Sequence, residues 1–395
     1  MRIPLLAIWI AAMLVLGAAQ AAEPIRIAHV YGKSGPLASY AAQLHTGLRM
    51  GFEYATDGTM TVLGRPLEII EKDTRLRSDR ARALLAEAYG QDDVVLAVGD
   101  LSSSVALSML PIAAEYRKIL IPQGVADVIT GEHWNRYLFR IGRSAAHDAV
   151  ANAVAVSAPG TCIAAFAQDY PFGRDGIAMY KKAAEKHGAR FVHEEYVESG
   201  SRELMTPMQR VFDALRETED CEARVIYGIW AGAGDPFGEL QKLELKQHDI
   251  KLSTNGNVLD ALVDYKRFPG LQGATYYYYE HPDNAVNYWL VVEHFKRYNR
   301  PPDLFTAQGM AEAMAIVAAL EKAGSTDTEA LIEAFEGLRF RSPKGELYIR
   351  PEDHQALQPM YHFEVVVEDR IAWAVPKLVR VIEAQELEIP IASRR

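Results

Sequence analysis

The stretch Val98-Gly99-Asp100-Leu101-Ser102-Ser103-Ser104 decides how the rest of the chain is interpreted. It ends an apolar, β-branched run at residues 94–98, which is typical of a buried parallel strand, and it precedes a helical run at residues 105–117. Serine is favoured at a helix start because its hydroxyl accepts from unpaired backbone N–H groups. Those N–H groups and the helix dipole also attract anions, and open α/β sheets bind ligands at this edge of a strand. The stretch therefore predicts either a simple helix cap or part of a ligand site.

Short apolar runs alternate with helical runs on both sides of this stretch, which is typical of a parallel sheet wrapped by helices. With 395 residues, the chain is also longer than one ordinary domain core. The alternation pauses at residues 142–144 and then restarts, so we expect two α/β units instead of one large sheet. Strands are expected over residues 25–31, 67–72, 94–98, 118–122, 137–141, 161–167, 189–197, 224–229 and 250–253, and helices over residues 37–55, 78–89, 105–117, 145–157, 172–187, 204–217 and 235–247.

Three segments interrupt the alternation, at residues 142–144, 270–279 and 341–345, and we expect the chain to cross between the two units at each of them. The second segment begins at a glycine and contains the run Tyr276-Tyr277-Tyr278-Tyr279. Successive side chains of a strand point to opposite faces, so at most half of these tyrosines can face a cleft, and ordinary packing is the alternative.

The remaining elements follow from the same division of the chain. Helices expected over residues 286–298 and 306–323 would pack on the first unit, and strands expected over residues 346–349 and 361–367 would join the second. The polar tail from residue 384 is expected to be frayed. The predicted lobes are residues 22–142 with 274–341, and residues 143–273 with 342–395.

The first 21 residues have the pattern of an export signal. Arg2 precedes an uncharged, mostly apolar segment, and Ala19-Gln20-Ala21 has the small-x-small form of a signal-peptidase site. A membrane anchor is the competing interpretation, but the apolar core at residues 5–16 is shorter than the roughly 20 residues that span a bilayer. We expect cleavage near Ala21 and a soluble periplasmic protein, without a lipid anchor because no cysteine lies near the cut.

Composition and motifs argue against nucleic-acid binding and against catalysis. The formal net charge is −10 and no basic cluster opposes it. His-Glu-x-x-His, a P-loop, Gly-x-Ser-x-Gly and Gly-x-Gly-x-x-Gly are all absent from the sequence. Asp353-His354 could form part of a triad but lies in a polar turn. We therefore predict no catalytic residues, no cofactor and no metal.

Cys162 and Cys221 are the two cysteines, and each immediately precedes an apolar strand. If the two strands are neighbours in a parallel sheet, both thiols lie at one sheet edge, where an oxidising compartment allows a disulfide. Two unpaired, partly buried thiols are the alternative. Two cysteines without nearby histidines do not suggest a metal site.

An ordered set of motifs resembles a known family. The set follows the export signal and runs in this order: Ser34-Gly35-Pro36, the Gly99–Ser104 stretch, Asp169-Tyr170-Pro171-Phe172-Gly173, Ser342-Pro343-Lys344-Gly345 and Asp353-His354-Gln355. It is similar to that of the branched-chain amino acid type of periplasmic binding protein, the type I solute receptors of ABC importers. The similarity extends from about residue 25 to about residue 367. The resemblance implies an α/β fold of two Rossmann-like lobes with parallel sheets, joined by three crossovers, with one small ligand in the cleft between them.

The resemblance also implies which residues contact the ligand. Ser103 would hold the ligand carboxylate, with Leu101 and Ser102 beside it and the backbone of Gln123, Gly124 and Val125 assisting. Aromatic side chains would form the walls, and core packing is the alternative for each of them. The implied aromatic residues are Tyr40, Tyr170, Phe172, Trp230 and Phe305.

Two positions depart from the family pattern. Amino-acid binders of this family carry threonine where this chain has Val125, and an acidic residue for the ligand ammonium where it has Asn255. A buried ammonium without a carboxylate partner is costly to desolvate, although Asp260 is near enough in sequence to substitute. Asn255 would instead act as a neutral polar contact, so the site should favour a carboxylate with an apolar or aromatic body, or an amide.

The function implied by the resemblance is that of an extracytoplasmic solute receptor. It would bind a small amino-acid-like or aromatic ligand and deliver it to an ABC permease in the inner membrane, acting as a monomer. A ligand-sensing periplasmic subunit of a signalling receptor is the alternative, and an enzyme is a weaker one. The sequence does not name the solute.

Overall fold

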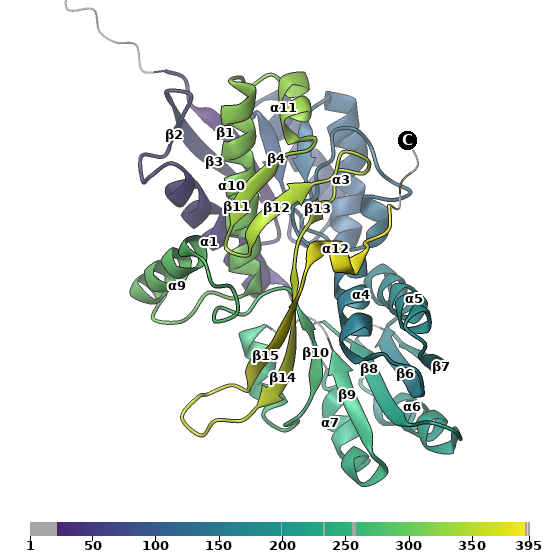
Figure 1. The fold of residues 1–395 in the computed structure, drawn as a ribbon. Helices are drawn as coiled ribbons and strands as arrows, with labels where there is room; N and C mark the ends of the chain where they lie inside the picture. Colours follow the sequence, from purple (N-terminus) through teal and green to yellow (C-terminus); the bar gives the residue numbers. More distant parts are fainter. Residues whose placement is uncertain (1–21, 199, 232–233, 255–257, 392, 394–395) are drawn as a thin grey trace, which may run out of the picture.

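The computed structural model describes residues 22–198, 200–231, 234–254, 258–391 and 393, so the predicted export signal lies outside the described residues. Figure 1 shows two lobes, each a sheet with helices against its faces. A smaller sheet of three strands accompanies the upper lobe. The predicted α/β class with two lobes is confirmed.

The first lobe is built on a sheet with strand order β2-β3-β1-β4-β5. β1 pairs in parallel with β3 and β4, β4 pairs in parallel with β5, and β2 is an antiparallel edge strand. The central strands are buried on both faces, which explains their uninterrupted apolar runs. The strands are β1 (Ile25–Tyr31), β2 (Thr61–Val62), β3 (Arg65–Asp73), β4 (Leu96–Val98) and β5 (Ile119–Ile121), and the helices of this lobe are α1 (Ala38–Ala55), α2 (Ser78–Gly90), α3 (Ser103–Tyr116), α9 (Ala285–Tyr298), α10 (Leu304–Ala323) and α11 (Thr328–Phe335).

Helices α1 and α10 pack against each other very closely. A Cβ on Gly47 would lie 2.0 Å from the Thr306 carbonyl oxygen, and a Cβ on Gly309 would lie 2.1 Å from that of Leu44. Only glycine permits this distance between the two backbones. Among the described residues, α10 is the one helix long and apolar enough to span a membrane, but it is mostly buried within this lobe, as a core helix is.

The second lobe is built on a sheet with strand order β15-β14-β10-β9-β8-β6-β7. β7, β6, β8, β9 and β10 are parallel, and β14 and β15 add an antiparallel edge. The strands are β6 (Thr161–Gln168), β7 (Arg190–Val197), β8 (Ala223–Ile229), β9 (Ile250–Thr254), β10 (Gln272–Thr275), β14 (Met360–Val366) and β15 (Val375–Ile382), and the helices are α4 (Ala145–Val156), α5 (Pro171–Lys186), α6 (Met205–Glu217), α7 (Pro236–Gln241), α8 (Leu259–Tyr265) and α12 (Ala384–Leu387).

Two expected strands are placed differently from the prediction. Residues 137–141 form isolated bridges, to Leu120 and to Gln355, instead of a strand. The strand expected over residues 346–349 does not join the second sheet. As β12 (Gly345–Ile349) it pairs with β11 (Arg339–Ser342) and β13 (Ala356–Leu357) in the three-stranded sheet. Residues 341–345 therefore include a hairpin turn within this sheet, and the prediction that the chain crosses between the lobes there is wrong. This sheet lies beside α10, because Leu347 and Ile349 turn their apolar side chains into the core of the first lobe.

The helix expected over residues 235–247 is broken into two pieces. Glu244 has a φ of 52°, in the left-handed region, and it separates α7 from the short 3₁₀ segment Leu245–His248. Another 3₁₀ segment, Asp127–Ile129, follows β5. The left-handed residue ends the regular hydrogen bonding, which periodicity alone does not reveal.

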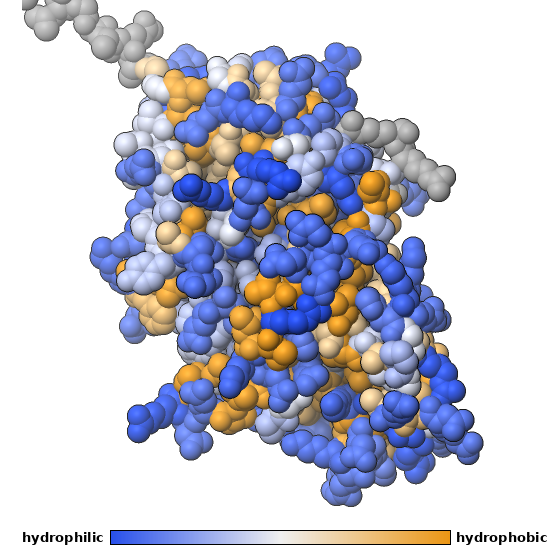
Figure 2. Space-filling model, viewed as in Figure 1, coloured by the Kyte–Doolittle hydropathy of each residue, from blue (hydrophilic) through white to orange (hydrophobic). Residues whose placement is uncertain are grey.

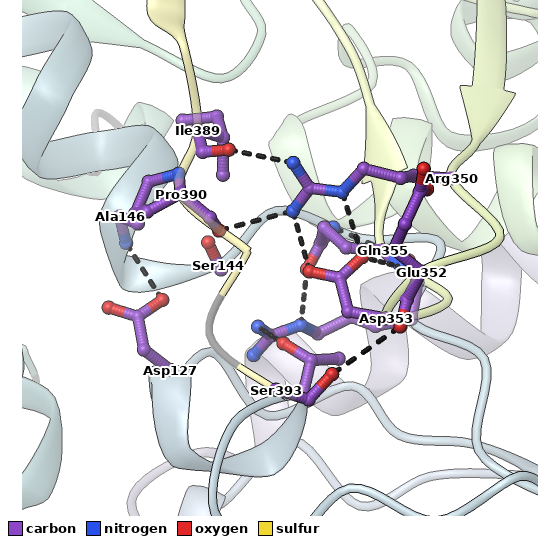
Figure 3. A network of polar contacts seen from close by, with 12 residues as sticks. Asp127, Ser144, Ala146, Arg350, Glu352, Asp353, Gln355, Ile389, Pro390 and Ser393 are labelled. Carbon is purple, nitrogen blue, oxygen red and sulfur yellow. Dashed lines mark hydrogen bonds and ion pairs between the residues drawn. The ribbon is translucent and has the colours of Figure 1, made fainter. Parts of the chain in front are cut away.

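The tail is held against the molecule, and the prediction that it is frayed is wrong for its described part. The guanidinium of Arg350 donates to the carbonyl oxygens of Ile389 at 2.7 Å and of Pro390 at 3.1 Å, and it also pairs with the carboxylate of Asp353 (Figure 3). Leu387 and Ile389 are buried. Apolar burial and backbone hydrogen bonds therefore hold this segment in place.

Strand β15 forms the exposed edge of the second sheet. Figure 2 shows apolar surface over β14 and β15, where Leu378, Val379 and Val381 are exposed. Lys377 and Arg380 lie between and beside them along the strand. Charged residues of this kind oppose the addition of a further strand to a sheet edge.

Candidate ligand-binding site

A cavity of about 280 Å³ lies between the two lobes, and side chains from both form its walls. Tyr40 from α1 and Phe305 from α10 belong to the first lobe. Phe172 from α5 and Trp230, directly after β8, belong to the second. The structure therefore brings together four of the aromatic residues that the sequence predicted. The carboxyl ends of parallel strands meet at one edge of each sheet, and this geometry places the helix starts and loops around the cavity.

The aromatic side chains are held in place by their neighbours. The Tyr40 and Phe305 rings stack with their centroids 4.8 Å apart. On the other wall, Gly234 has a φ of +108°, and a Cβ there would lie 3.1 Å from the Trp230 ring. Glycine lets this loop pass close to the indole. Phe237 and Tyr265 continue the aromatic lining.

A buried ion pair, which the sequence analysis did not identify, lines the same cavity. The Nε of Arg143 lies 2.9 and 2.8 Å from the two carboxylate oxygens of Asp148, and both side chains are buried. Burial raises the pKa of Asp148, and Arg143 opposes that shift. Arg143 lies in the first crossover and Asp148 in the first turn of α4. An Arg at a crossover, with an Asp five residues later, is the signal that could have pointed to this pair.

The serine stretch is built differently from the predicted cap. Ser102 is the N-cap of α3 but makes no capping bond with its side chain. The buried carboxylate of Asp100 instead accepts from the Ser102 N–H at 2.9 Å and from the Thr74 hydroxyl at 2.6 Å. Of the two alternatives for this stretch, the simple cap by the Ser102 side chain is therefore not formed.

Ser103 connects the helix to the loop after β5. Its Oγ accepts from the backbone N–H groups of Val125 and Ala126, both at 3.2 Å. These contacts use the Val125 N–H that was expected to assist in holding a ligand carboxylate. Gly124 fits closely against the same serine, since a Cβ there would lie 2.9 Å from the Ser103 Cα.

Gln123 is committed to a buried polar network. Its side-chain oxygen lies 3.2 Å from Nε2 of His29, and its nitrogen donates to Glu312 at 2.8 Å. Leu101 is part of the first-lobe core. Among the described residues, none of this group lines the aromatic cavity: Leu101, Ser102, Ser103, Gln123, Gly124 and Val125. The group adjoins the cavity through Val125, which belongs to the same apolar cluster as Phe172.

The remaining predicted residues lie at the edge of the site or outside its described part. Tyr170 lies 5.7 Å from Phe172, ring to ring, and burial raises its pKa to about 12. Asn255 lies outside the described residues. Asp260 does line the cavity, where it is exposed. Burial raises the pKa of Tyr40, with Asp260 as the next contribution.

Cys162 and Cys221 are joined in a disulfide, with their Cα atoms 5.6 Å apart. Of the two alternatives left open by the sequence, the structure has the bonded one. β6 and β8 are neighbours in parallel, which places both cysteines at the amino-terminal edge of the sheet. The described residues contain no group of three His, Cys, Asp or Glu side chains arranged to hold a metal ion.

The comparison with known proteins agrees with this architecture. A family model described as "Periplasmic binding protein" matches residues 24–370. An ABC-type branched-chain amino acid transporter protein from Rhodopseudomonas palustris CGA009 is 52% identical, with a TM-score of 0.88 over 94% of this chain and 100% of that chain. An ABC transporter protein from Rhodopseudomonas palustris is 48% identical, with a TM-score of 0.52 over 88% of this chain and 98% of that chain.

More distant structures share the fold. A solute-binding protein from Rhodopseudomonas palustris BisB5, in complex with 3,4-dihydroxybenzoic acid, is 23% identical, with a TM-score of 0.77 over 91% of this chain and 98% of that chain. No curated protein matches the sequence. Proteins of the matched family bind solutes for ABC transporters and are not enzymes. The chain belongs to the periplasmic binding proteins, and it is an extracytoplasmic solute receptor of an ABC importer.

Proposed function

We propose that this receptor binds one small ligand with an apolar or aromatic body and a carboxylate or amide end, in the cavity between its lobes. The observation that carries the proposal is the aromatic lining contributed by both lobes. Aromatic side chains supply large apolar contact area with few rotatable bonds, which suits a preformed ligand site. A cavity of about 280 Å³ fits a molecule the size of an amino acid or a benzoate.

The ligand would contact Tyr40 and Phe305 on one side, and Phe172 and Trp230 on the other. Ser103 uses only its oxygen lone pairs in its bonds to the loop, so its hydroxyl hydrogen remains available to a ligand acceptor. Tyr170 would support Phe172 from behind. We retain Asn255 as a proposed polar contact. The Rhodopseudomonas palustris relative that is 52% identical is named for branched-chain amino acids, which supports a ligand with an apolar side chain.

The loaded receptor would dock on a membrane permease as a monomer, after removal of residues 1–21. The lobe division proposed from the sequence is residues 22–142 with 274–341, and residues 143–273 with 342–395. We now assign residues 342–357 to the first lobe, because β12 and β13 form one sheet with β11 beside α10. The charged residues along β15 support the monomeric state, because they oppose pairing between sheet edges.

A ligand screen by thermal shift tests the proposal. The mature protein would be mixed separately with leucine, benzoate, 4-hydroxybenzoate, 4-methyl-2-oxopentanoate, benzamide and leucinamide. A ligand that binds only the folded state raises the melting temperature, with about 2.7 kcal/mol of stabilisation at one hundred times Kd. We expect at least one carboxylate or amide to do so. No rise with any of the six compounds would contradict the proposal.

Two substitutions test whether the ligand binds in the cavity. Trp230→Leu and Phe305→Leu each remove aromatic area from one wall, and we expect each to weaken the best ligand of the screen by about tenfold, measured by titration calorimetry. Tyr288→Leu is the matched control, because this tyrosine is 73% exposed on α9. Equal affinities in all three variants would exclude the cavity as the binding site.

A further inference from the structure

We infer that Arg143 anchors a ligand carboxylate, so that the receptor selects carboxylates over the matching amides. The inference rests on the proposed function and narrows it, because that proposal admits both kinds of ligand. It also assigns the binding of the ligand carboxylate to the guanidinium of Arg143 in the first crossover. The sequence had predicted Ser103 and the backbone of residues 123–125 for this role.

The hydrogen bonding of Arg143 is incomplete. Its side chain is 6% exposed and lines the cavity, and its Nε is bonded to Asp148. Its Nη1 is buried and has no hydrogen-bond partner among the described residues. A buried charged donor without an acceptor costs more than an ordinary unsatisfied group. A ligand oxygen at Nη1 would remove this cost, and arginine presents its donors in the fork that matches a carboxylate.

The charges around Arg143 favour an anion over a neutral group. Lys344, in the turn between β11 and β12, is buried, and its Nζ lies 3.6 Å from the centroid of the Tyr276 ring, while Arg143 lies 5.5 Å from the same centroid. Two basic groups therefore face one ring, near the buried carboxyl groups of Asp148 and Glu312. Burial and the neighbouring Arg143 hold the pKa of Lys344 well below its usual value. A ligand carboxylate nearby would favour the charged form of Lys344, because an opposite charge stabilises an ammonium group.

The other charged residues that line the cavity interact only weakly with a ligand carboxylate. Asp235, Asp260, Asp264 and Arg267 line the cavity but are exposed, where water screens them. Burial removes that screening at Arg143, so its interaction with a ligand charge is stronger.

The surroundings of Arg143 also determine where the ligand body would lie. The guanidinium carbon lies 5.8 Å from the centroid of the Phe305 ring, which is itself stacked on Tyr40. A carboxylate bound at Nη1 would therefore place its apolar body against this aromatic pair. The backbone N–H groups of Val125 and Ala126 are already bonded to Ser103. They are therefore not needed to bind the ligand carboxylate.

Paired probes test the inference in the mature protein. Benzoate with benzamide, and 4-methylpentanoate with 4-methylpentanamide, each keep one body and change only the end group. Affinities would be measured by titration calorimetry in wild type, in Arg143→Lys, in the double variant Arg143→Met/Asp148→Asn, and in Arg82→Lys as an exposed arginine of α2 outside the cavity. The double variant removes both charges together, so that no buried carboxylate loses its partner.

We expect wild type to prefer at least one carboxylate over its amide by about tenfold or more, and Arg143→Lys to lose about tenfold in carboxylate affinity. The double variant should bind both members of a pair equally, with its amide affinity retained, and Arg82→Lys should behave as wild type. Retained amide binding also shows that the double variant is folded.

Other outcomes separate the two proposals. A wild type that binds amides as tightly as carboxylates, or a carboxylate preference that survives in both Arg143 variants, overturns the inference and leaves the proposed function standing. If none of the four probes and no other carboxylate or amide binds wild type, the proposed function fails and the inference fails with it.

Discussion

At the scale of single residues, a chain of buried polar side chains runs behind the loop that follows β5. Nδ1 of His29 lies 3.0 Å from Nδ1 of His45, and Gln123 continues the chain to Glu312. Glu312 accepts a second hydrogen bond, from Gln308 at 3.0 Å. Its carboxyl group has no cation among these partners, so burial raises its pKa to about 7.

The raised pKa of Glu312 predicts a loss of stability as pH rises. The folded pKa of about 7 lies above the ordinary value of 4.5, so the folded state binds the proton more tightly than the unfolded chain. The stabilising contribution is complete below pH 4.5 and is lost as pH rises through 7. We expect Glu312→Gln, which stays neutral, to gain about 3 kcal/mol relative to wild type between pH 5 and pH 8, measured by urea unfolding.

The structure can accept this substitution, because the buried side-chain oxygen of Gln308 has no hydrogen-bond partner and a flip of its amide would present that oxygen to the new donor. Glu321→Gln, at an exposed position of the same helix, is the control and should follow the wild-type profile. Parallel profiles for Glu312→Gln and wild type would show that Glu312 does not titrate in this range.

At the scale of elements, the disulfide and the cavity lie at opposite edges of the second sheet. The disulfide joins the starts of β6 and β8, whereas Phe172 and Trp230 follow the ends of the same strands. The two ends of β6 and β8 therefore have different roles. One edge is cross-linked for stability, and the other presents side chains to the cavity.

Removing the disulfide should therefore lower stability without changing ligand binding. Cys162 and Cys221 are 59 residues apart, and closing a loop of this length stabilises a protein by about 4 kcal/mol in the chain-entropy model. We expect Cys162→Ala/Cys221→Ala to lose about 2–4 kcal/mol in urea unfolding. Dithiothreitol should reproduce the loss in wild type and have no effect on the variant. A matching loss of ligand affinity would contradict the separation of the two edges.

At the scale of the whole molecule, the first two crossovers lie where the charged residues of the site are gathered. Arg143 comes from the first crossover and Tyr276 from the second, and Lys344 comes from the turn between β11 and β12. Both basic groups lie over the Tyr276 ring. A ligand bound there would touch the segments that connect the lobes as well as the walls on either side. Ligand binding and the angle between the lobes are then coupled.

This coupling predicts that a bound ligand makes the molecule more compact. A ligand that contacts Tyr40 and Trp230 together favours the conformation in which both walls approach it. We expect the radius of gyration in small-angle X-ray scattering to fall when the best ligand of the screen is saturating, and to stay constant with a probe that does not bind. An unchanged radius at saturation would mean that the lobes do not move on binding.

The sequence by itself determined the elements and the general position of the site. Apolar runs that are buried on both faces are recognisable locally, so β1 was predicted with the bounds that the structure has, and α1 within one residue. The aromatic residues at strand ends and helix starts, such as Phe172 and Trp230, were found because parallel strands bring these ends together.

Only the tertiary structure decided how polar groups are paired and which sheet each late strand joins. Arg143 and Asp148 are ordinary charged residues in the sequence, and their burial beside Lys344 depends on three distant segments meeting. β12 joins a third sheet, and the tail after β15 is bound by Arg350, because each finds its partners far away in the chain. Local patterns record the preferences of neighbouring residues, whereas desolvation and charge pairing are set by contacts that exist only in the folded molecule.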